Sequence, residues 1–100
     1  MEGRIESYTH SDSITENKGG SLIKLVCQTD FAARTDEFKS LSSYVAKMAY
    51  AAFASSVGSA EAFRQQDLYD VFPEVKEKIE ETSKLLKEEI KIFEIVVIVI

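Results

Sequence analysis

The stretch SLIKLVCQTDFAARTDEF, residues 21–38, decides the fold of this chain. Its first eight residues follow the period of two that places successive side chains on opposite faces of a β-strand. The expected faces are Ile23, Leu25 and Cys27 on one side, and Leu22, Lys24, Val26 and Gln28 on the other. Thr35 is a favoured N-cap residue, and Asp36 and Glu37 then put negative charge in the first helical turn, where the helix dipole favours it. The stretch therefore predicts a strand over 21–28, a corner, and a helix that begins near Thr35.

The helix expected after residue 35 has one apolar face. Apolar side chains recur there at spacings of three and four residues, the pattern of a helix that packs one side against a core. These positions are Phe38, Leu41, Val45, Met48 and Ala52, whereas Ser40, Ser43 and Lys47 point away. The pattern predicts that the helix ends near Ser55, before Gly58.

The residues before this unit predict a second strand. Polar and apolar side chains alternate from Arg4 to Tyr8, which is typical of a half-buried strand and predicts one over about residues 3–10. The segment SDSITENKGG, residues 11–20, is polar and ends in two glycines, so it predicts a loop. Two strands so close in sequence pair most simply in the antiparallel direction.

The residues after the first long helix predict three further elements. Residues 60–66 predict a short helix capped by Ser59, and residues 67–72 a less regular connection. Pro73 opens another helix, because proline is best tolerated at the first helical position, and this helix is expected to end near Glu89. The β-branched run at 90–100 predicts a third strand.

Together these elements predict an α+β fold, a three-stranded antiparallel sheet with helices packed on one face. One hundred residues are the size of one domain, so residues 1–100 are expected to form a single domain.

Composition excludes several classes of protein. The net charge of −5 argues against a simple nucleic-acid binder and is compatible with a protein partner that carries a basic patch. The N-terminal MEGRIESYTH lacks the apolar run of a signal peptide, and the C-terminal IKIFEIVVIVI is much shorter than the roughly 20 residues of a membrane helix. The single cysteine excludes an internal disulfide and fits a reducing, cytoplasmic location.

The expected third strand is apolar on both faces. Residues 95–100 carry no charge and no proline, and such a strand at an exposed sheet edge would pair with other chains. Burial of this surface in a homodimer, through the C-terminal strand, is the preferred interpretation. The alternative is that further residues of a longer natural chain cover it.

Catalytic and metal-binding interpretations have little support. His10 and Cys27 are the only imidazole and the only thiol, and a nucleophilic pair would need them within hydrogen-bond reach. Cys27 instead shares its expected face with apolar residues, so it is interpreted as a small core side chain. One histidine and one cysteine do not make a tetrahedral metal site, and the 11–20 loop matches neither a phosphate loop nor a calcium loop. The sequence predicts no metal and no cofactor.

Asp30 and Phe31 lie at the corner between the strand and the helix. In the structural interpretation Phe31 tucks under the sheet and Asp30 caps the turn. In the functional interpretation Phe31 is an exposed wedge beside an acid, held for insertion into a partner, as aromatic anchors are at binding hot spots.

The chain resembles the core of bacterial and organellar elongation factor Ts. EGRIESYTH and GSLIKLVCQTDFAARTDEFKSLSSYVAKMAYAA are similar to the family's EGxIxSYxH, a glycine-containing loop, CxTDFVAR and then (N/T)xEFxxLxxxxAxxxAA. The matching positions are Glu2, Gly3, Ile5, Ser7, Tyr8, His10, Cys27, Thr29, Asp30, Phe31, Ala33, Arg34, Glu37, Phe38 and Leu41. The resemblance is specific through about residue 52 and loose in EETSKLLKEEIKIFEI.

The resemblance implies a guanine-nucleotide exchange factor for the translational GTPase EF-Tu. Thr29, Asp30, Phe31 and Ala32 would form the tip that enters the nucleotide-binding domain of the GTPase, where Phe31 would insert between two helices and promote release of GDP. No covalent bond is made or broken, so the chain is not expected to be an enzyme.

The sequence also departs from the family pattern. Ala32 replaces the usual valine, and Gln28 stands where a charged residue is common. The chain is expected to consist of the core alone, with no N-terminal helical docking module and no coiled-coil arm. The main alternative is therefore a module that binds EF-Tu without speeding GDP release, as a decoy or an assembly subunit. An inert structural dimer and a small cysteine enzyme complete the alternatives.

Overall fold

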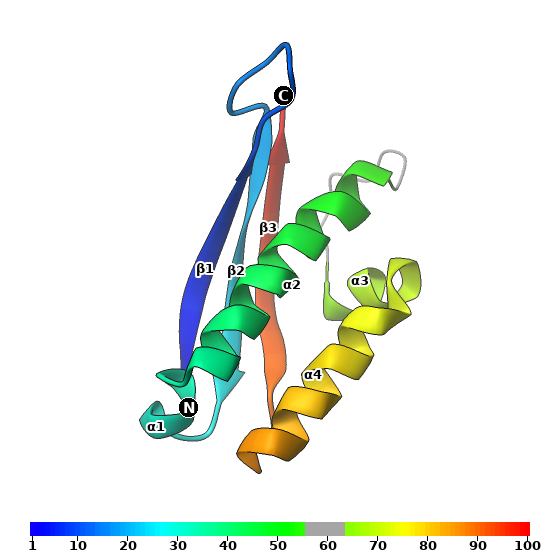
Figure 1. Cartoon of the computed structure of the whole chain (residues 1–100). Coiled ribbons are helices and arrows are strands. Elements are labelled where there is room, and N and C mark those ends of the chain that lie inside the picture. The colour runs from blue at the N-terminus through cyan, green and yellow to red at the C-terminus, as the bar shows by residue number, and fades with distance from the viewer. Residues whose placement is uncertain (56–63) are drawn as a thin grey trace.

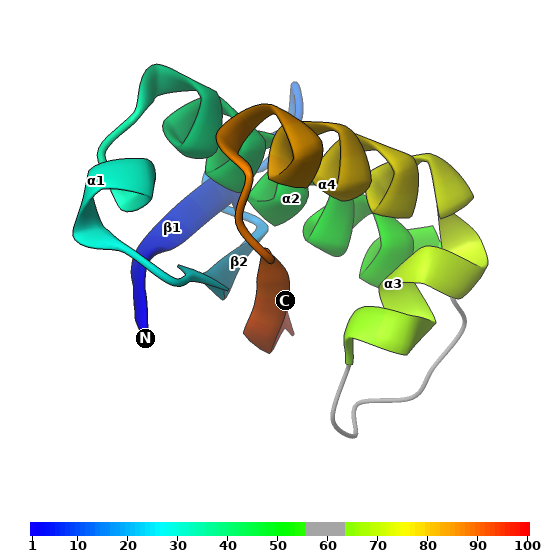
Figure 2. The ribbon, with the colours of Figure 1, turned by 90° about the horizontal axis from the view of Figure 1, so that it is seen from below.

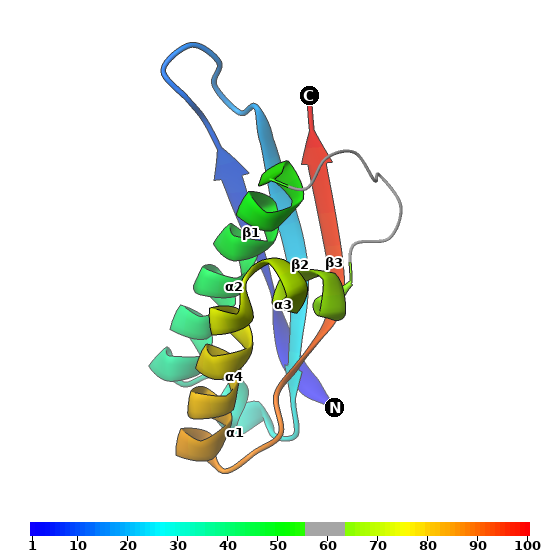
Figure 3. The ribbon, with the colours of Figure 1, turned by 90° about the vertical axis from the view of Figure 1, so that its right-hand side faces the viewer.

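The computed structural model describes residues 1–55 and 64–100. Its three strands form one antiparallel sheet in the order β1-β2-β3, and its helices lie on one side of that sheet (Figures 1 and 3). This confirms the predicted α+β fold. In chain order the elements are β1 (Glu2–His10), β2 (Gly19–Cys27), α1 (Asp30–Ala33), α2 (Asp36–Ser55), α3 (Gln65–Val71), α4 (Pro73–Leu86) and β3 (Lys91–Val99).

The β1–β2 pair is the hairpin that the sequence predicts, but its loop is shorter than expected. Glu2 pairs with Cys27 and His10 with Gly19, so both glycines of the expected loop belong to the strand. A Cβ on Gly19 would lie 2.7 Å from the Ile98 carbonyl oxygen, and one on Gly20 would lie 2.5 Å from a carbonyl oxygen of β1. These glycines therefore allow the neighbouring strands to approach closely. In the sequence alone, two glycines placed there for this reason look the same as two glycines of a turn.

The core lies between the sheet and helices α2 and α4. The side chains expected to face it from the two elements of the 21–38 stretch do so, with Met48 half-buried and the others buried: Ile23, Leu25, Cys27, Phe38, Leu41, Val45 and Ala52. Because the strand period and the helix period both direct apolar groups to this layer, β2 and α2 pack against each other. The predicted helix from residue 36 to Ser55 is confirmed.

The region before α4 differs from the prediction. Helix α3 covers residues 65–71, so the prediction of an irregular connection over residues 67–72 is wrong. The Asp67 carboxylate accepts a hydrogen bond from the Arg64 N–H at 2.8 Å, and Leu68 is fully buried, so one cap and one core contact hold the short helix. The helix predicted over 60–66 falls mostly outside the described residues.

Helix α4 begins at Pro73, as predicted, but ends at Leu86, three residues earlier than expected. Lys87 adopts the left-handed conformation, with φ of 58°, and its N–H bonds to the Ser83 carbonyl. This C-cap ends the helix without glycine, which is the usual residue at such a position.

The face of the sheet that points away from the helices is open. Exposed apolar side chains gather on it from all three strands: Ile5, Leu22, Phe93, Val96 and Ile98. Within the chain, then, the helices cover only one face of β3, although the sequence favoured cover on both. Among helices of the described residues, none is long and apolar enough to cross a membrane.

Candidate functional site

The corner between β2 and α2 contains a four-residue helix, α1, that the sequence did not predict (Figure 2). The Thr29 hydroxyl caps it by accepting a hydrogen bond from the Ala32 N–H at 3.2 Å. At its other end, the Arg34 N–H lies 3.2 Å from the Asp30 carbonyl oxygen and 3.3 Å from that of Phe31. The corner is thus a hydrogen-bonded turn.

Phe31 projects from this turn into solvent. Its side chain is 78% exposed, whereas that of the next residue, Ala32, is only 2% exposed. Successive helical residues point about 100° apart, so the buried Ala32 and Ala33 methyl groups direct the phenyl ring outward. The interpretation of Phe31 as a core side chain is therefore wrong.

Asp30, beside the exposed ring, does not cap the turn, because Thr29 does. The Asp30 carboxylate instead forms an ion pair with Arg34 at 3.2 Å, one helical turn later. Both side chains are exposed, so the pair contributes only about 0.3–0.5 kcal/mol. Of the four predicted tip residues, Thr29, Asp30 and Phe31 are exposed and Ala32 lies beneath them.

Thr35 connects the corner to α2. Its hydroxyl accepts a hydrogen bond from the Phe38 N–H at 3.1 Å, which confirms the predicted cap, and donates one to the Ala32 carbonyl at 2.8 Å. Since Phe38 is fully buried, the corner is tied directly to the core. Two threonines, Thr29 and Thr35, therefore hold α1 from both ends.

Glu88 contacts the same corner, and sequence reasoning missed it. Its Oε1 atom accepts hydrogen bonds from the Gln28 and Thr29 N–H groups, each at 2.9 Å, and its Oε2 atom accepts one from the Thr29 hydroxyl. The bond to the hydroxyl, together with the two backbone bonds, lowers the pKa of the Glu88 carboxyl below its ordinary value. No local pattern signals this contact, because Glu88 lies 59 residues after Thr29.

The structure separates the only thiol from the only imidazole. Cys27 pairs with the first residue of β1 and His10 is the last, eight residues along the strand, which places them about 26 Å apart. Burial raises the pKa of the Cys27 thiol, and the negative charge of Glu88 adds to this effect. Neither geometry nor acidity supports a cysteine nucleophile.

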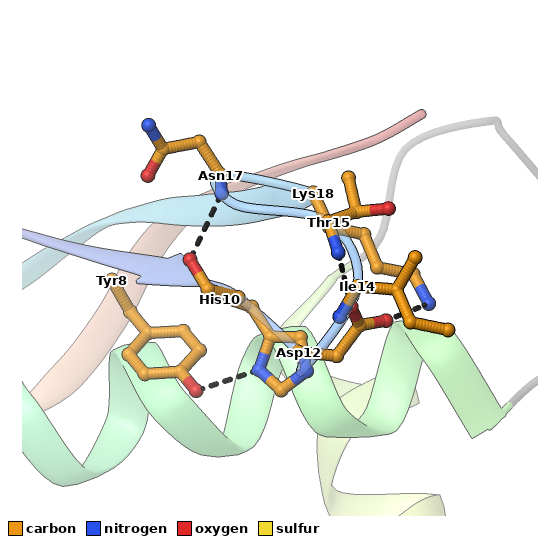
Figure 4. A network of polar contacts seen from close by, with 8 residues as sticks. Tyr8, His10, Asp12, Ile14, Thr15, Asn17 and Lys18 are labelled. Atoms are coloured by element: carbon orange, nitrogen blue, oxygen red, sulfur yellow. Dashed lines mark hydrogen bonds and ion pairs between the residues drawn. The ribbon is translucent and has the colours of Figure 1, made fainter.

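His10 belongs instead to an aromatic cluster near the β1–β2 loop (Figure 4). Its Nδ1 atom lies 2.9 Å from the Tyr8 hydroxyl, and its ring stacks on Tyr50 with the centroids 4.7 Å apart. In the part of the chain that the structure describes, His, Cys, Asp and Glu side chains nowhere gather in a group of three that could hold a metal ion.

The β1–β2 loop itself is organised by one carboxylate (Figure 4). Asp12 Oδ1 accepts hydrogen bonds from the Thr15 N–H at 2.6 Å and the Ile14 N–H at 2.8 Å, and Oδ2 lies 3.1 Å from the Lys18 ammonium nitrogen. These interactions, the Thr15 bond foremost, lower the pKa of Asp12 from 3.8 to about 2. Ile14 at the loop tip is 92% exposed.

Comparison with known proteins identifies relatives for part of the chain. It is 49% identical over 45 residues to elongation factor Ts of Fervidobacterium nodosum, which is 45% of this chain and 21% of that protein. It is 41% identical over 51 residues to elongation factor Ts of Carboxydothermus hydrogenoformans, which is 51% of this chain and 22% of that protein. The chain thus matches about a fifth of the length of these curated relatives, and no family model matches it. Over about half of its length, this chain is similar to elongation factor Ts.

Proposed function

We propose that this chain binds the translational GTPase EF-Tu and promotes release of GDP, with Phe31 as the wedge. The observation that carries the proposal is the 78% exposed phenyl ring on a turn that is anchored in the core by the buried Ala32 and Ala33. A large apolar ring gains from leaving water, and a fixed backbone lowers the entropy lost when the ring enters a pocket. The similarity to elongation factor Ts supplies the class of partner.

The four residues of the tip take different parts in this proposal. Phe31 inserts between helices of the nucleotide-binding domain, and the exposed Asp30 carboxylate meets polar or basic groups at the rim. Thr29 caps the turn, and Ala32 fills the space beneath the ring. A valine at position 32 would add two methyl groups at this buried point.

Exchange follows from linkage between two ligands of one GTPase. A wedge that binds the nucleotide-free form more tightly than the GDP form must, by reciprocity, weaken GDP binding by the same factor. The protein makes and breaks no covalent bond in this process. Such a role belongs in the cytoplasm, where translation takes place.

A second candidate is a module that binds EF-Tu without accelerating GDP release. The small size of the anchored corner favours it, because one exposed ring suffices for attachment while exchange also requires that the nucleotide site be disturbed. Both candidates depend on Phe31, and they differ only in the effect on bound GDP.

We also propose that the open sheet face is covered by a second copy of the chain. Its exposed apolar groups come from all three strands, and exposed apolar patches often mark interaction sites. Ile98→Lys should convert a dimer to a monomer in sedimentation velocity, whereas Leu85→Lys, at an exposed position on α4, should not. A wild-type protein that stays monomeric at high micromolar concentration would contradict the dimer.

Release of a fluorescent GDP analogue from bacterial EF-Tu tests the two candidate functions. The exchange factor predicts faster release with the wild-type chain, no acceleration with Phe31→Ala, and unchanged acceleration with Ile14→Ala. Ile14 is a suitable control because it is an exposed apolar residue of the β1–β2 loop, which lies at the end of the sheet opposite α1 (Figure 1). Binding without faster release would select the binding module, and the absence of both would contradict both.

A further inference from the structure

Glu88 accepts hydrogen bonds from two backbone N–H groups that lie just beyond the end of β2. Strand β2 ends at Cys27, so Gln28 and Thr29 have left the sheet ladder and their N–H groups need other partners. One oxygen of Glu88 serves both, at 2.9 Å each. This carboxylate therefore binds the chain at the point where it leaves the sheet.

The same carboxylate sets the orientation of the Thr29 hydroxyl. An ionised carboxylate only accepts hydrogen bonds, so the hydroxyl proton points to Glu88 and an oxygen lone pair is left for the Ala32 N–H. That second bond is the N-cap of α1. Glu88, Thr29 and the backbone beneath Phe31 are therefore consecutive members of one hydrogen-bonded chain.

Glu88 is itself held firmly by the turn between α4 and β3. Its N–H donates to the Ser83 carbonyl at 3.1 Å, and its own carbonyl accepts a hydrogen bond from the Ser83 hydroxyl. Lys87 before it closes the helix in the left-handed conformation, and Ile90 after it is buried. The position of the Glu88 carboxylate is thus fixed by residues in the C-terminal half of the chain.

We propose that Glu88 is a positioning residue that holds the Thr29–Phe31 corner in the orientation in which Phe31 meets its partner. This inference rests on the proposed function. Without the carboxylate, the corner must be ordered during binding, which weakens binding without removing the ring that acts on the nucleotide site. Since Gln28 and Thr29 are exposed, water replaces the lost acceptor and the fold remains stable.

The test compares Glu88→Ala, Glu88→Gln and Glu89→Ala. Glu89 is the matched control, because it is the neighbouring exposed glutamate and its contact is with Lys91, at 3.4 Å. The first readout is hydrogen exchange of the Gln28 and Thr29 amides, followed by NMR in the free protein. Glu88→Ala should accelerate it about tenfold, Glu88→Gln, which retains one acceptor oxygen, should be intermediate, and Glu89→Ala should leave it unchanged.

The second readout separates positioning from the action of the wedge. In GDP release measured against protein concentration, Glu88→Ala should raise the half-saturating concentration about tenfold and leave the plateau rate unchanged, whereas Phe31→Ala should lower the plateau. Wild-type amide exchange or a wild-type half-saturating concentration in Glu88→Ala would overturn the proposal.

The two readouts also separate failure of this inference from failure of the proposed function. If the wild-type chain does not accelerate GDP release, the exchange function and a role for Glu88 in it are both contradicted, while amide exchange still decides whether Glu88 orders the corner. If the wild-type chain is active and Glu88→Ala equals it, only the positioning role is contradicted. Should Glu88→Ala not fold, the intermediate effect expected of Glu88→Gln decides.

Discussion

The β1–β2 loop and α1 lie at opposite ends of the sheet (Figure 1), and each carries an exposed apolar side chain, Ile14 and Phe31, that is held in a different way. At the β1–β2 loop, Asp12 accepts hydrogen bonds from the N–H groups of Ile14 and Thr15, two and three positions later. At the corner that carries Phe31, Glu88 accepts them from residues 59 and 60 positions earlier. Both devices use one carboxylate to satisfy two backbone N–H groups.

The difference in sequence separation has a physical consequence. The loop requires only its own residues to close around Asp12, so it forms wherever the hairpin forms. The corner requires α4 to end at Leu86 and β3 to join the sheet before Glu88 reaches it. Presentation of Phe31 therefore depends on the fold of the C-terminal half, and presentation of Ile14 does not.

The largest expected effect distinguishes two phenylalanines that lie seven residues apart. Phe38 is 0% exposed, so Phe38→Ala should lower the free energy of unfolding by about 3–5 kcal/mol. Phe31→Ala should lower it by less than about 0.5 kcal/mol, as expected of a surface substitution. Urea denaturation measures both, and equal losses would show that Phe31 is a core residue in solution.

The next largest effect is the loss of affinity for EF-Tu, which should differ between substitutions at the two ends of the sheet. Removing an aromatic anchor from a contact costs about 2 kcal/mol or more, so Phe31→Ala should weaken binding to nucleotide-free EF-Tu by that amount. Ile14→Ala should change the affinity by less than about 0.5 kcal/mol, although Ile14 is the more exposed side chain. Calorimetric titration tests this, and a larger loss with Ile14→Ala would move the binding surface to the loop.

A smaller effect concerns the cap of α1. Thr29→Ala removes the hydroxyl that accepts a hydrogen bond from the Ala32 N–H. This should lower the free energy of unfolding by about 1 kcal/mol, as N-cap replacements do. Thr29→Ser keeps the hydroxyl and should retain most of that stability. Thermal unfolding of both variants is the measurement, and equal melting temperatures for Ala and Ser would mean that the cap contributes nothing.

The smallest effect is the pH dependence of the loop. The pKa of Asp12 is lowered in the folded protein from 3.8 to about 2. The stability that its ionised carboxylate contributes is therefore fully present above about pH 4 and is lost as the pH falls from about 4 to about 2. The Ile14 and Thr15 amide resonances should follow this titration in NMR spectra. In Asp12→Asn they should not titrate in this window, and an Asp12 midpoint near 4 in the wild type would contradict the hydrogen-bonded loop.

Much of the fold was predictable because its signals are local. The period of two in β2 and the spacing of three and four in α2 predicted the buried faces of both elements, and the Thr35 cap lies where it was expected. The predictions that failed depended on distant neighbours. Gly19 and Gly20 were assigned to the loop, but their space is occupied by atoms of adjacent strands. Helix α3 depends on the burial of Leu68, which no periodic pattern in seven residues reveals.

The candidate site shows the same division. The residue types at Thr29, Asp30 and Phe31, and their place at a corner, are properties of the sequence. Only the tertiary structure decided that the Phe31 ring faces solvent, because the Ala32 and Ala33 methyl groups occupy the side of α1 that meets the core. It also brought Glu88 to Thr29, since a contact across 59 residues has no period or spacing and exists only after the chain has folded.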